Sequence, residues 1–169
     1  ATRRSSDLET RHSQEKNKLR EVFMDKTDSV ILTILKENSR ASASDISKQV
    51  SLSVPAVTER IRKLEQTDVI EKYTIRVNPG ASGYNLLAFI LVKMDYSRNM
   101  DVFQDTCRQL PQVLECHHIA GPADFLLKVL FRDMQDIEDF LSGTLKDIPG
   151  VTDANTIICL STLKEEITV

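Results

Sequence analysis

The alternation of apolar and polar positions in the first half of the chain has the period of an α-helix. Apolar residues recur every three or four positions, which predicts three short helices over residues 25–38, 44–50 and 54–66. The third helix has the clearest apolar stripe, formed by Val54, Val57, Ile61 and Leu64. Ser44 and Ser53 are predicted to cap the second and third helices, and Pro55 lies in a first turn, where its missing N–H costs little.

Beyond Asp68 the period changes to two. The alternation continues as far as Val77, which predicts a β-hairpin after the third helix. Residues 79–85 contain one proline and two glycines and are predicted to form a linker. Three helices followed by a strand pair is the order of a winged helix-turn-helix domain, which we expect over residues 24–78.

The second half of the chain mixes strands with helices. The pattern predicts strands over residues 86–96, 113–120, 124–131 and 151–160, and helices over residues 101–110 and 134–148. The resulting order, βαββαβ, is that of the ferredoxin-like split motif. The predicted fold class is therefore α+β: an N-terminal winged helix-turn-helix domain and a C-terminal ferredoxin-like βαββαβ domain over residues 86–169.

The first predicted strand of the second domain is apolar on both faces. Its alternating positions are Leu87, Phe89 and Leu91 on one face and Ala88, Ile90 and Val92 on the other. The ferredoxin-like order puts both helices on one face, so a second copy of the sheet is the simplest cover for the other. We therefore expect a homodimer joined through this domain.

Composition predicts a cytoplasmic protein that does not associate with a membrane. Of the 169 residues, 41% are hydrophobic and 28% are charged, and no apolar run approaches the about 20 residues that span a bilayer. No signal peptide is visible, and the three cysteines, an odd number and widely spaced, argue for reduced thiols. Residues 1–23 have few apolar positions and are either a native extension or a remnant from upstream.

The net charge of −3 is distributed unevenly. Residues 24–78 carry nine basic and eight acidic side chains, whereas residues 79–169 carry seven basic and thirteen acidic ones. Residues 1–23 carry six basic and four acidic groups. If native, they are expected either to add non-specific affinity for phosphate without choosing the site or to form a disordered tail with no role. Such asymmetry suggests that the two halves face different partners, although a solvated acidic surface would give the same pattern.

The outer face of the third helix has side chains that suit DNA recognition. Small residues at its start permit close approach to base edges, Thr58 and Glu59 can contact bases, and Arg62 and Lys63 can bind phosphate or guanine. The predicted DNA-binding residues are Ser53, Pro55, Ala56, Thr58, Glu59, Arg60, Arg62 and Lys63. The expected partner is double-stranded DNA, and the alternative is a plain three-helix bundle with a solvated face.

Several motifs occur in a fixed order along both halves. Those of the first half are Asp28-x-x-Ile31-Leu32-x-x-Leu35, Arg40-x-Ser42, Ile46-Ser47-x-x-Val50-x-Leu52-Ser53, Val57-x-x-Arg60-Ile61-x-x-Leu64-Glu65, Ile70-x-x-Tyr73 and Asn78-Pro79. Those of the second half are Val102-Phe103, Glu115-Cys116-His117, Gly121-x-x-Asp124-Phe125-Leu126-Leu127-Lys128 and Leu145-x-x-Ile148-Pro149-Gly150-Val151. In order and spacing they resemble the Lrp/AsnC (leucine-responsive/asparagine, or feast/famine) family of transcription regulators, over about residues 24–161.

The resemblance implies a DNA-binding regulator whose second domain dimerises through its sheet, with dimers assembling further into octamers or discs. It also implies a small-molecule effector, an amino acid or related metabolite, bound between dimers. The implied effector-binding residues are Ala120, Gly121, Pro122, Asp124, Thr156, Ile157 and Ile158. Family members commonly have an acidic residue directly after the glycine, but this chain has Pro122, so one potential partner for an α-ammonium group is absent.

Other chemistry finds less support in the sequence. Cys116 and His118 can share a face of a strand, but two ligands are too few for a zinc site, and packing is the favoured interpretation. The chain has no phosphate-binding loop and no nucleophile elbow, so no catalytic residue, metal or cofactor is predicted. The alternative function is a ferredoxin-like small-molecule-binding protein or enzyme without DNA binding; Arg62 and Lys63 favour DNA.

Overall fold

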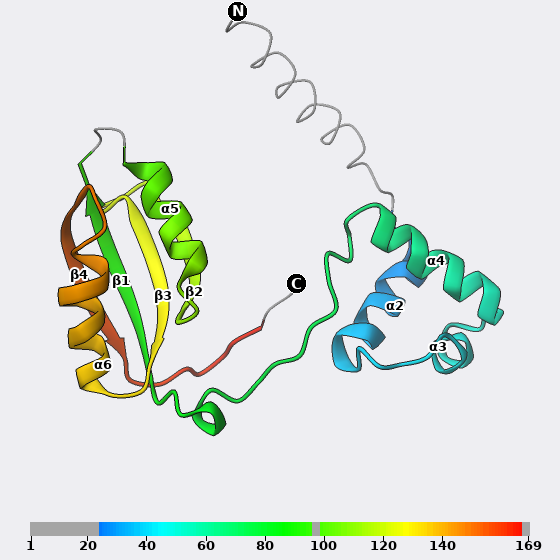
Figure 1. The fold of residues 1–169 in the computed structure, drawn as a ribbon. Coiled ribbons are helices and arrows are strands. Elements are labelled where there is room, and N and C mark those ends of the chain that lie inside the picture. The colour runs from blue at the N-terminus through cyan, green and yellow to red at the C-terminus, as the bar shows by residue number, and fades with distance from the viewer. Residues whose placement is uncertain (1–23, 96–98, 167–169) are drawn as a thin grey trace, which may run out of the picture. The chain divides into compact units, whose positions relative to one another are not determined.

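The computed structural model describes residues 24–95 and 99–166. The described residues form two compact units, which divide between Ile75 and Arg76, and each unit is described by itself (Figure 1). The predictions made for residues 1–23 lie outside the described residues. Among the helices that are described, none is long and apolar enough to cross a membrane.

The first unit is a three-helix bundle built from α2 (Lys26–Glu37), α3 (Ala43–Val50) and α4 (Val54–Gln66). Its core consists of the buried side chains Ile31, Leu35, Ile46, Val57 and Leu64. Capping boxes fix the starts of α2 and α3, because Asp25 and Ser42 each accept a hydrogen bond from the backbone three residues later. The predicted cap Ser44 is therefore wrong: Ser42 occupies that position, and its partner is Asp45.

The predicted hairpin after α4 is also wrong. Val69 and Ile70 pack against the helical core, and none of the described residues from there to Asn78 lies in a strand. A hairpin needs two runs that exchange backbone hydrogen bonds, and residues 71–78 form none with one another. It is extended and unpaired, so its alternating apolar side chains are exposed, including Ile75 at 74% and Val77 at 58%.

The second unit is a four-stranded antiparallel sheet with its helices on one face (Figure 1). The elements in chain order are β1 (Leu86–Met94), α5 (Met100–Gln109), β2 (Val113–His118), β3 (Phe125–Phe131), α6 (Met134–Asp139), the π-helical turn η2 (Phe140–Leu145) and β4 (Val151–Cys159). The strand order β2-β3-β1-β4 confirms the ferredoxin-like arrangement. The core lies between helices and sheet and is centred on Ile90, Phe103, Leu127 and Phe131.

The second helix of this unit changes pitch halfway. One regular helix was predicted from 134 to 148, but the backbone widens at Phe140, and the Lys146 N–H donates to the Leu141 carbonyl five residues earlier. The wider turn puts Phe140 and Leu145, also five residues apart, into the same core.

None of the described helices of this unit covers the opposite face of the sheet. Strand pairing places Leu87, Phe89, Leu91, Leu126, Leu130 and Ile157 on this face, which we call the open face. Charged side chains also lie on this face. Lys128 forms ion pairs with Glu115 at 3.1 Å and Glu165 at 2.5 Å, and Lys93 and Asp153 lie 3.6 Å apart toward one end. A continuous apolar surface of this kind is a candidate interface.

Candidate functional sites

Helix α4 presents most of its predicted DNA-binding side chains to solvent. Its N-terminus is formed by Ser53, whose side chain makes no capping hydrogen bond, and by Pro55 in the first turn. Ala56 is half-buried, while Ser53, Pro55, Thr58, Glu59, Arg62 and Lys63 are exposed. Exposed polar groups at the start and along the outer face of a second helix-turn-helix helix are positioned to enter a groove of DNA.

Glu59 and Arg62 form a two-pronged ion pair on this face. The Arg62 Nε donates to Glu59 Oε2 at 2.8 Å, and its Nη2 donates to Oε1 at 2.6 Å. The pair lowers the pKa of Glu59 and raises that of Arg62, so both stay charged. Exposed pairs of this type contribute little to stability, so either side chain can exchange its partner at little cost.

Arg60 has a different environment from Arg62. Its Nη1 donates to Asp25 Oδ2 and to Asp28 Oδ1, both at 2.7 Å, so it joins α4 to the start of α2. The Asp28 side chain is only 15% exposed, and the two carboxylates raise the pKa of Arg60. We therefore assign Arg60 to helix packing rather than to the outer face of α4.

Tyr73 is a residue whose role the sequence pattern did not reveal. Its hydroxyl donates to Glu65 Oε1 at 2.9 Å, and burial together with this carboxylate raises the pKa of Tyr73 to about 12. The contact fastens the extended segment after Asp68 to the end of α4. The alternation of apolar residues concealed it, since a tyrosine in such a pattern is typical of a strand.

The turn between β2 and β3 holds the first group of predicted effector residues. Ala120, Gly121 and Pro122 are exposed, and a Cβ on Gly121 would meet no atom within 4 Å. Asp124 is half-buried: its Oδ2 accepts the Met94 N–H at 2.7 Å, beyond the last β1–β3 pair. The Asp124 carboxylate therefore has a structural partner in addition to any ligand role.

The second group of predicted effector residues lies on β4. Thr156 pairs with Ile90 and Ile158 with Ala88, so both face the helices, whereas Ile157 pairs with Phe89 on the open face. Strand β1 separates β4 from β3, so one chain does not bring the two groups together. The Thr156 hydroxyl is buried and has no hydrogen-bond partner among the described residues, a cost that a ligand or second chain could remove.

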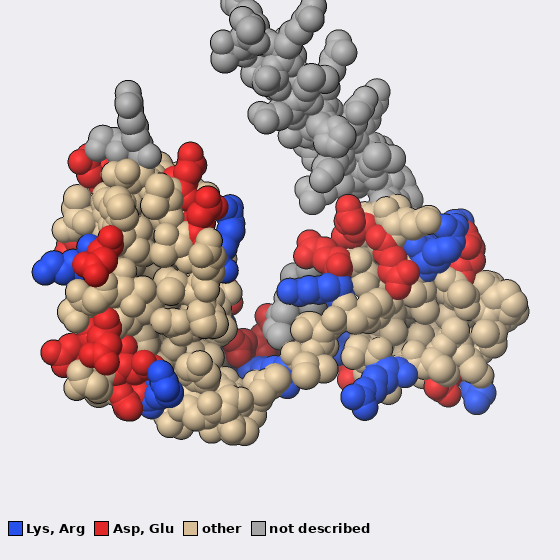
Figure 2. Space-filling model, viewed as in Figure 1, with Lys and Arg blue, Asp and Glu red and all other residues tan. Residues whose placement is uncertain are grey.

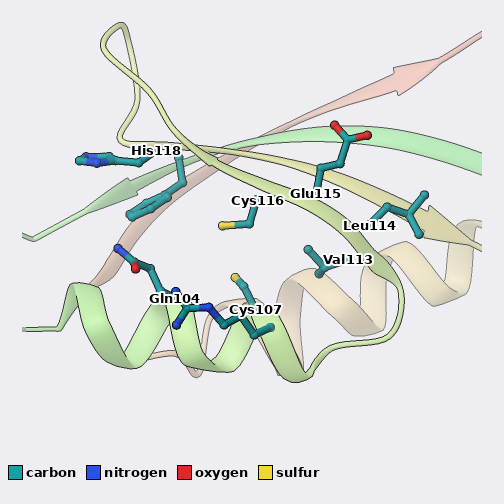
Figure 3. Close-up of a pocket in the computed structure, with 9 residues that line it drawn as sticks. Gln104, Cys107, Val113, Leu114, Glu115, Cys116 and His118 are labelled. Atoms are coloured by element: carbon teal, nitrogen blue, oxygen red, sulfur yellow. The ribbon is translucent and has the colours of Figure 1, made fainter. Parts of the chain in front are cut away.

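Cys116 and His118 share the helix-facing side of β2, where they pair with Leu127 and Phe125. His118 stacks on Phe125 with ring centroids 5.0 Å apart, while Cys116 points toward Cys107 on α5 (Figure 3). Within the described ranges, no group of three or more His, Cys, Asp or Glu side chains is placed to hold a metal ion.

Comparison with known proteins identifies both units. Residues 24–71 match the family model for a winged helix-turn-helix DNA-binding domain, and residues 87–169 match that for the Lrp/AsnC ligand-binding domain. The HTH-type transcriptional regulator FL11 of Pyrococcus horikoshii is 35% identical over 144 residues, covering 85% of this chain and 94% of the relative. The leucine-responsive regulatory protein of Escherichia coli is 33% identical over 145 residues, covering 84% and 88%.

Solved structures agree with this assignment. A transcriptional regulator from Neisseria meningitidis, solved as a complex with L-Met, superposes with a TM-score of 0.83 at 31% identity, covering 86% of this chain and 96% of that one. Escherichia coli AsnC shares the fold, with a TM-score of 0.80 at 23% identity over 85% of this chain and 97% of that one. The chain is a member of the Lrp/AsnC family of transcription regulators, in which a DNA-binding helix-turn-helix unit precedes a ligand-binding unit.

Proposed function

We propose that the protein acts as a dimer that reads two half-sites of double-stranded DNA through α4 and that a small amino acid or related metabolite modulates this binding. The observation that carries the proposal is the exposed face of α4, where Thr58, Glu59, Arg62 and Lys63 lie together without a structural task in the core. One such helix per chain reads one half-site, so a palindromic operator requires two chains.

The open face of the sheet supports self-association. Burial of an apolar face stabilises an interface by roughly 25 cal/mol per Å² of apolar surface, and here six large apolar side chains share one flat surface. Its only charged member on β3, Lys128, is already paired within the chain, so a second sheet would not bury an isolated charge there. Further assembly of dimers into octamers is part of this proposal.

The effector proposal rests on the ligand-binding unit and on the relative that was solved with L-Met. The two groups of predicted effector residues lie on either side of β1, so a site that includes both requires residues from more than one chain. The expected ligand carries a carboxylate, which the backbone N–H groups of Ala120 and Gly121 can hold, and an ammonium group that faces Asp124.

Asp124→Asn tests the effector site more cleanly than Asp124→Ala. The amide oxygen of asparagine can still accept the Met94 N–H, whereas the negative charge that would hold an ammonium group is lost. We expect calorimetry across the twenty amino acids and common keto acids to detect a ligand for the parent and at least tenfold weaker binding for Asp124→Asn. Equal binding by the two proteins would exclude Asp124 as the ammonium partner.

The relatives are named transcriptional regulators, and we infer that this chain likewise regulates and has no catalytic activity of its own. We place its action in the cytoplasm, because it must reach chromosomal DNA.

DNA binding by α4 is tested with Arg62→Ala in the full chain, followed by fluorescence anisotropy at two salt concentrations. If Arg62 meets guanine, the variant loses about 1–3 kcal/mol of discrimination at one base pair; if it meets phosphate, the salt slope shrinks by about one unit. Arg108→Ala is the matched control, because Arg108 forms the same i,i+3 ion pair with Asp105 on α5. Unchanged binding by Arg62→Ala at both salt concentrations would refute the assignment.

A further inference from the structure

Two of the three cysteines lie next to each other between α5 and β2. Cys107 on α5 is 3% exposed, whereas Cys116 on β2 is exposed. Their sulfur atoms point toward one another (Figure 3), and their interaction moves the pKa values of the two thiols in opposite directions. The third cysteine, Cys159, is remote from this pair: it pairs with Leu87 on β1, and its Sγ donates to the Ser161 carbonyl at 3.3 Å.

A small solute can reach the pair through a surface cavity. The cavity measures about 420 Å³, far more than the about 30 Å³ of one water molecule, and both cysteines line it together with Gln104, Arg108 and His118. Cys116 faces the helix side of the sheet, as its pairing with the buried Leu127 shows. A dimer formed through the open face would therefore leave the cavity accessible.

The two thiols differ in acidity in the way that a redox pair requires. The interaction with Cys107 lowers the pKa of Cys116 to about 7, and the positive charge of Arg108 acts in the same direction. The same interaction, followed by burial, raises the pKa of Cys107 well above its ordinary value. At neutral pH the thiolate, which is the nucleophilic form, is thus concentrated on the exposed cysteine.

We propose that Cys107 and Cys116 form a reversible oxidation site for small hydroperoxides. The Cys116 thiolate attacks one peroxide oxygen, so that an S–O bond forms, the O–O bond breaks, and the departing oxygen takes a proton to leave as water or alcohol. The Cys107 sulfur then attacks the Cys116 sulfenic acid, an S–S bond forms, and the S–O oxygen leaves as water with the Cys107 proton. The two thiols lose two electrons, which reduce the hydroperoxide, and a dithiol reductant converts the disulfide back to two thiols by thiol–disulfide exchange.

The local fold permits the disulfide. A disulfide is about 2.05 Å long, so the two sulfur atoms must approach one another for it to form. Strand β2 lies at the edge of the sheet and has a register shift between Val113 and Glu115, so it is held by one neighbour only and can move toward α5. A short connection links α5, which ends at Gln109, to β2.

The test is thiol mapping of the reduced full-length protein after exposure to hydrogen peroxide. Free thiols are blocked with N-ethylmaleimide, and the digest is analysed by mass spectrometry. We expect one dithiothreitol-sensitive crosslink between the peptides of Cys107 and Cys116, with Cys159 still alkylated. Oxidation of Cys159 before the pair, or crosslinks that mainly join two chains, would overturn the proposal.

Three variants separate the two roles. Cys116→Ser should slow peroxide consumption by at least tenfold, because Cys107 is buried and protonated. Cys107→Ala, which introduces no polar group into the core, should leave Cys116 as a sulfenic acid that dimedone traps, at a lower rate because the interaction between the two thiols is gone. Cys159→Ser is the control and should form the crosslink at the parental rate. Parental peroxide consumption by Cys116→Ser would contradict the proposal.

Discussion

At the scale of single residues, two arginines on one helix have separate tasks. Arg60 and Arg62 are two positions apart, so they project about 200° from each other around α4. Arg60 reaches the carboxylates of α2, whereas Arg62 stays on the outer face with Glu59. The sequence predicted both as DNA-binding, because residue type and helical pattern alone do not reveal that two acidic caps of another helix lie within reach.

Replacing Arg60 tests this division. Arg60→Met keeps the aliphatic stem but removes the charge, and the partly exposed Arg60–Asp28 pair is worth about 0.2–1 kcal/mol of unfolding free energy. Denaturant titration should show a loss of this size for Arg60→Met and none for Arg62→Met. A loss of DNA affinity without a loss of stability would instead place Arg60 at the DNA.

The cluster of Asp25, Asp28 and Arg60 also makes the stability of the first unit depend on pH in the acidic range. The Asp28 N–H and then Arg60 hold the pKa of Asp25 below its ordinary value of 3.8. A lowered pKa stabilises the folded state above the ordinary value, and this contribution is lost as the pH falls below 3.8 toward the folded-state pKa. Between pH 5 and pH 2 the thermal midpoint should therefore fall less steeply for Arg60→Met than for the parent, and parallel curves would contradict this.

At the scale of elements, the sequence predicted which helices and strands exist, and in what order, better than it predicted where each begins and ends. The three helices of the first unit and the βαββαβ order of the second follow from apolar period, and the structure confirms them. The predictions were wrong where packing of a side chain into the core, and not the local apolar pattern, decides the conformation. Val69 and Ile70 fit a strand pattern but are captured by the helical core, and the turn at Phe140 widens because two side chains five residues apart both enter the core.

The predicted sites also differ in whether the local sequence pattern was enough to predict them. The outer face of α4 could be predicted, since its exposure follows directly from the position of its apolar stripe. The effector residues could not be assembled into one site from the sequence, because their pairing partners show that Thr156 and Ile157 face opposite sides of the sheet. The acceptor role of Asp124 toward the Met94 N–H depends on a contact between distant segments, which no local pattern encodes.

The start of α3 provides a test at this scale. Ser42 accepts the Asp45 N–H and Asp45 in turn accepts from Ser42, whereas Ser44 lies inside the first turn. Ser42→Ala should lower the free energy of unfolding by about 0.5–2 kcal/mol, while Ser44→Ala should leave it nearly unchanged. Chemical denaturation of both variants distinguishes the two caps, and equal losses would mean that the capping box does not set the start of the helix.

At the scale of the whole molecule, the two units differ in their balance of acidic and basic side chains. Acidic side chains gather over α6 in the second unit, while basic and acidic groups are interspersed on the first (Figure 2). The acidic surplus of residues 79–169 lies in the unit that binds ligand, so it need not oppose phosphate contacts made by α4. This separation explains how a chain with a net charge of −3 can bind DNA.

Self-association through the open face has a direct test. Phe89→Asp places a charge at the centre of this face, opposite Ile157, and should convert the protein to a monomer at micromolar concentration in analytical ultracentrifugation. Met134→Asp is the control, because Met134 is equally apolar and 60% exposed but lies on α6, on the helix side. A parent that is already monomeric, or a dimeric Phe89→Asp, would rule out this interface.

Hydroxyl-radical footprinting on fragments selected from random DNA by the full-length protein shows whether two copies of α4 read DNA together. We predict two protected patches related by two-fold symmetry and roughly 34–36 Å apart along the duplex. At a protein concentration just sufficient to saturate the parent, both patches should weaken together in Arg62→Ala and in Phe89→Asp. A single unsymmetrical patch, or full protection that persists in Arg62→Ala, would contradict the account.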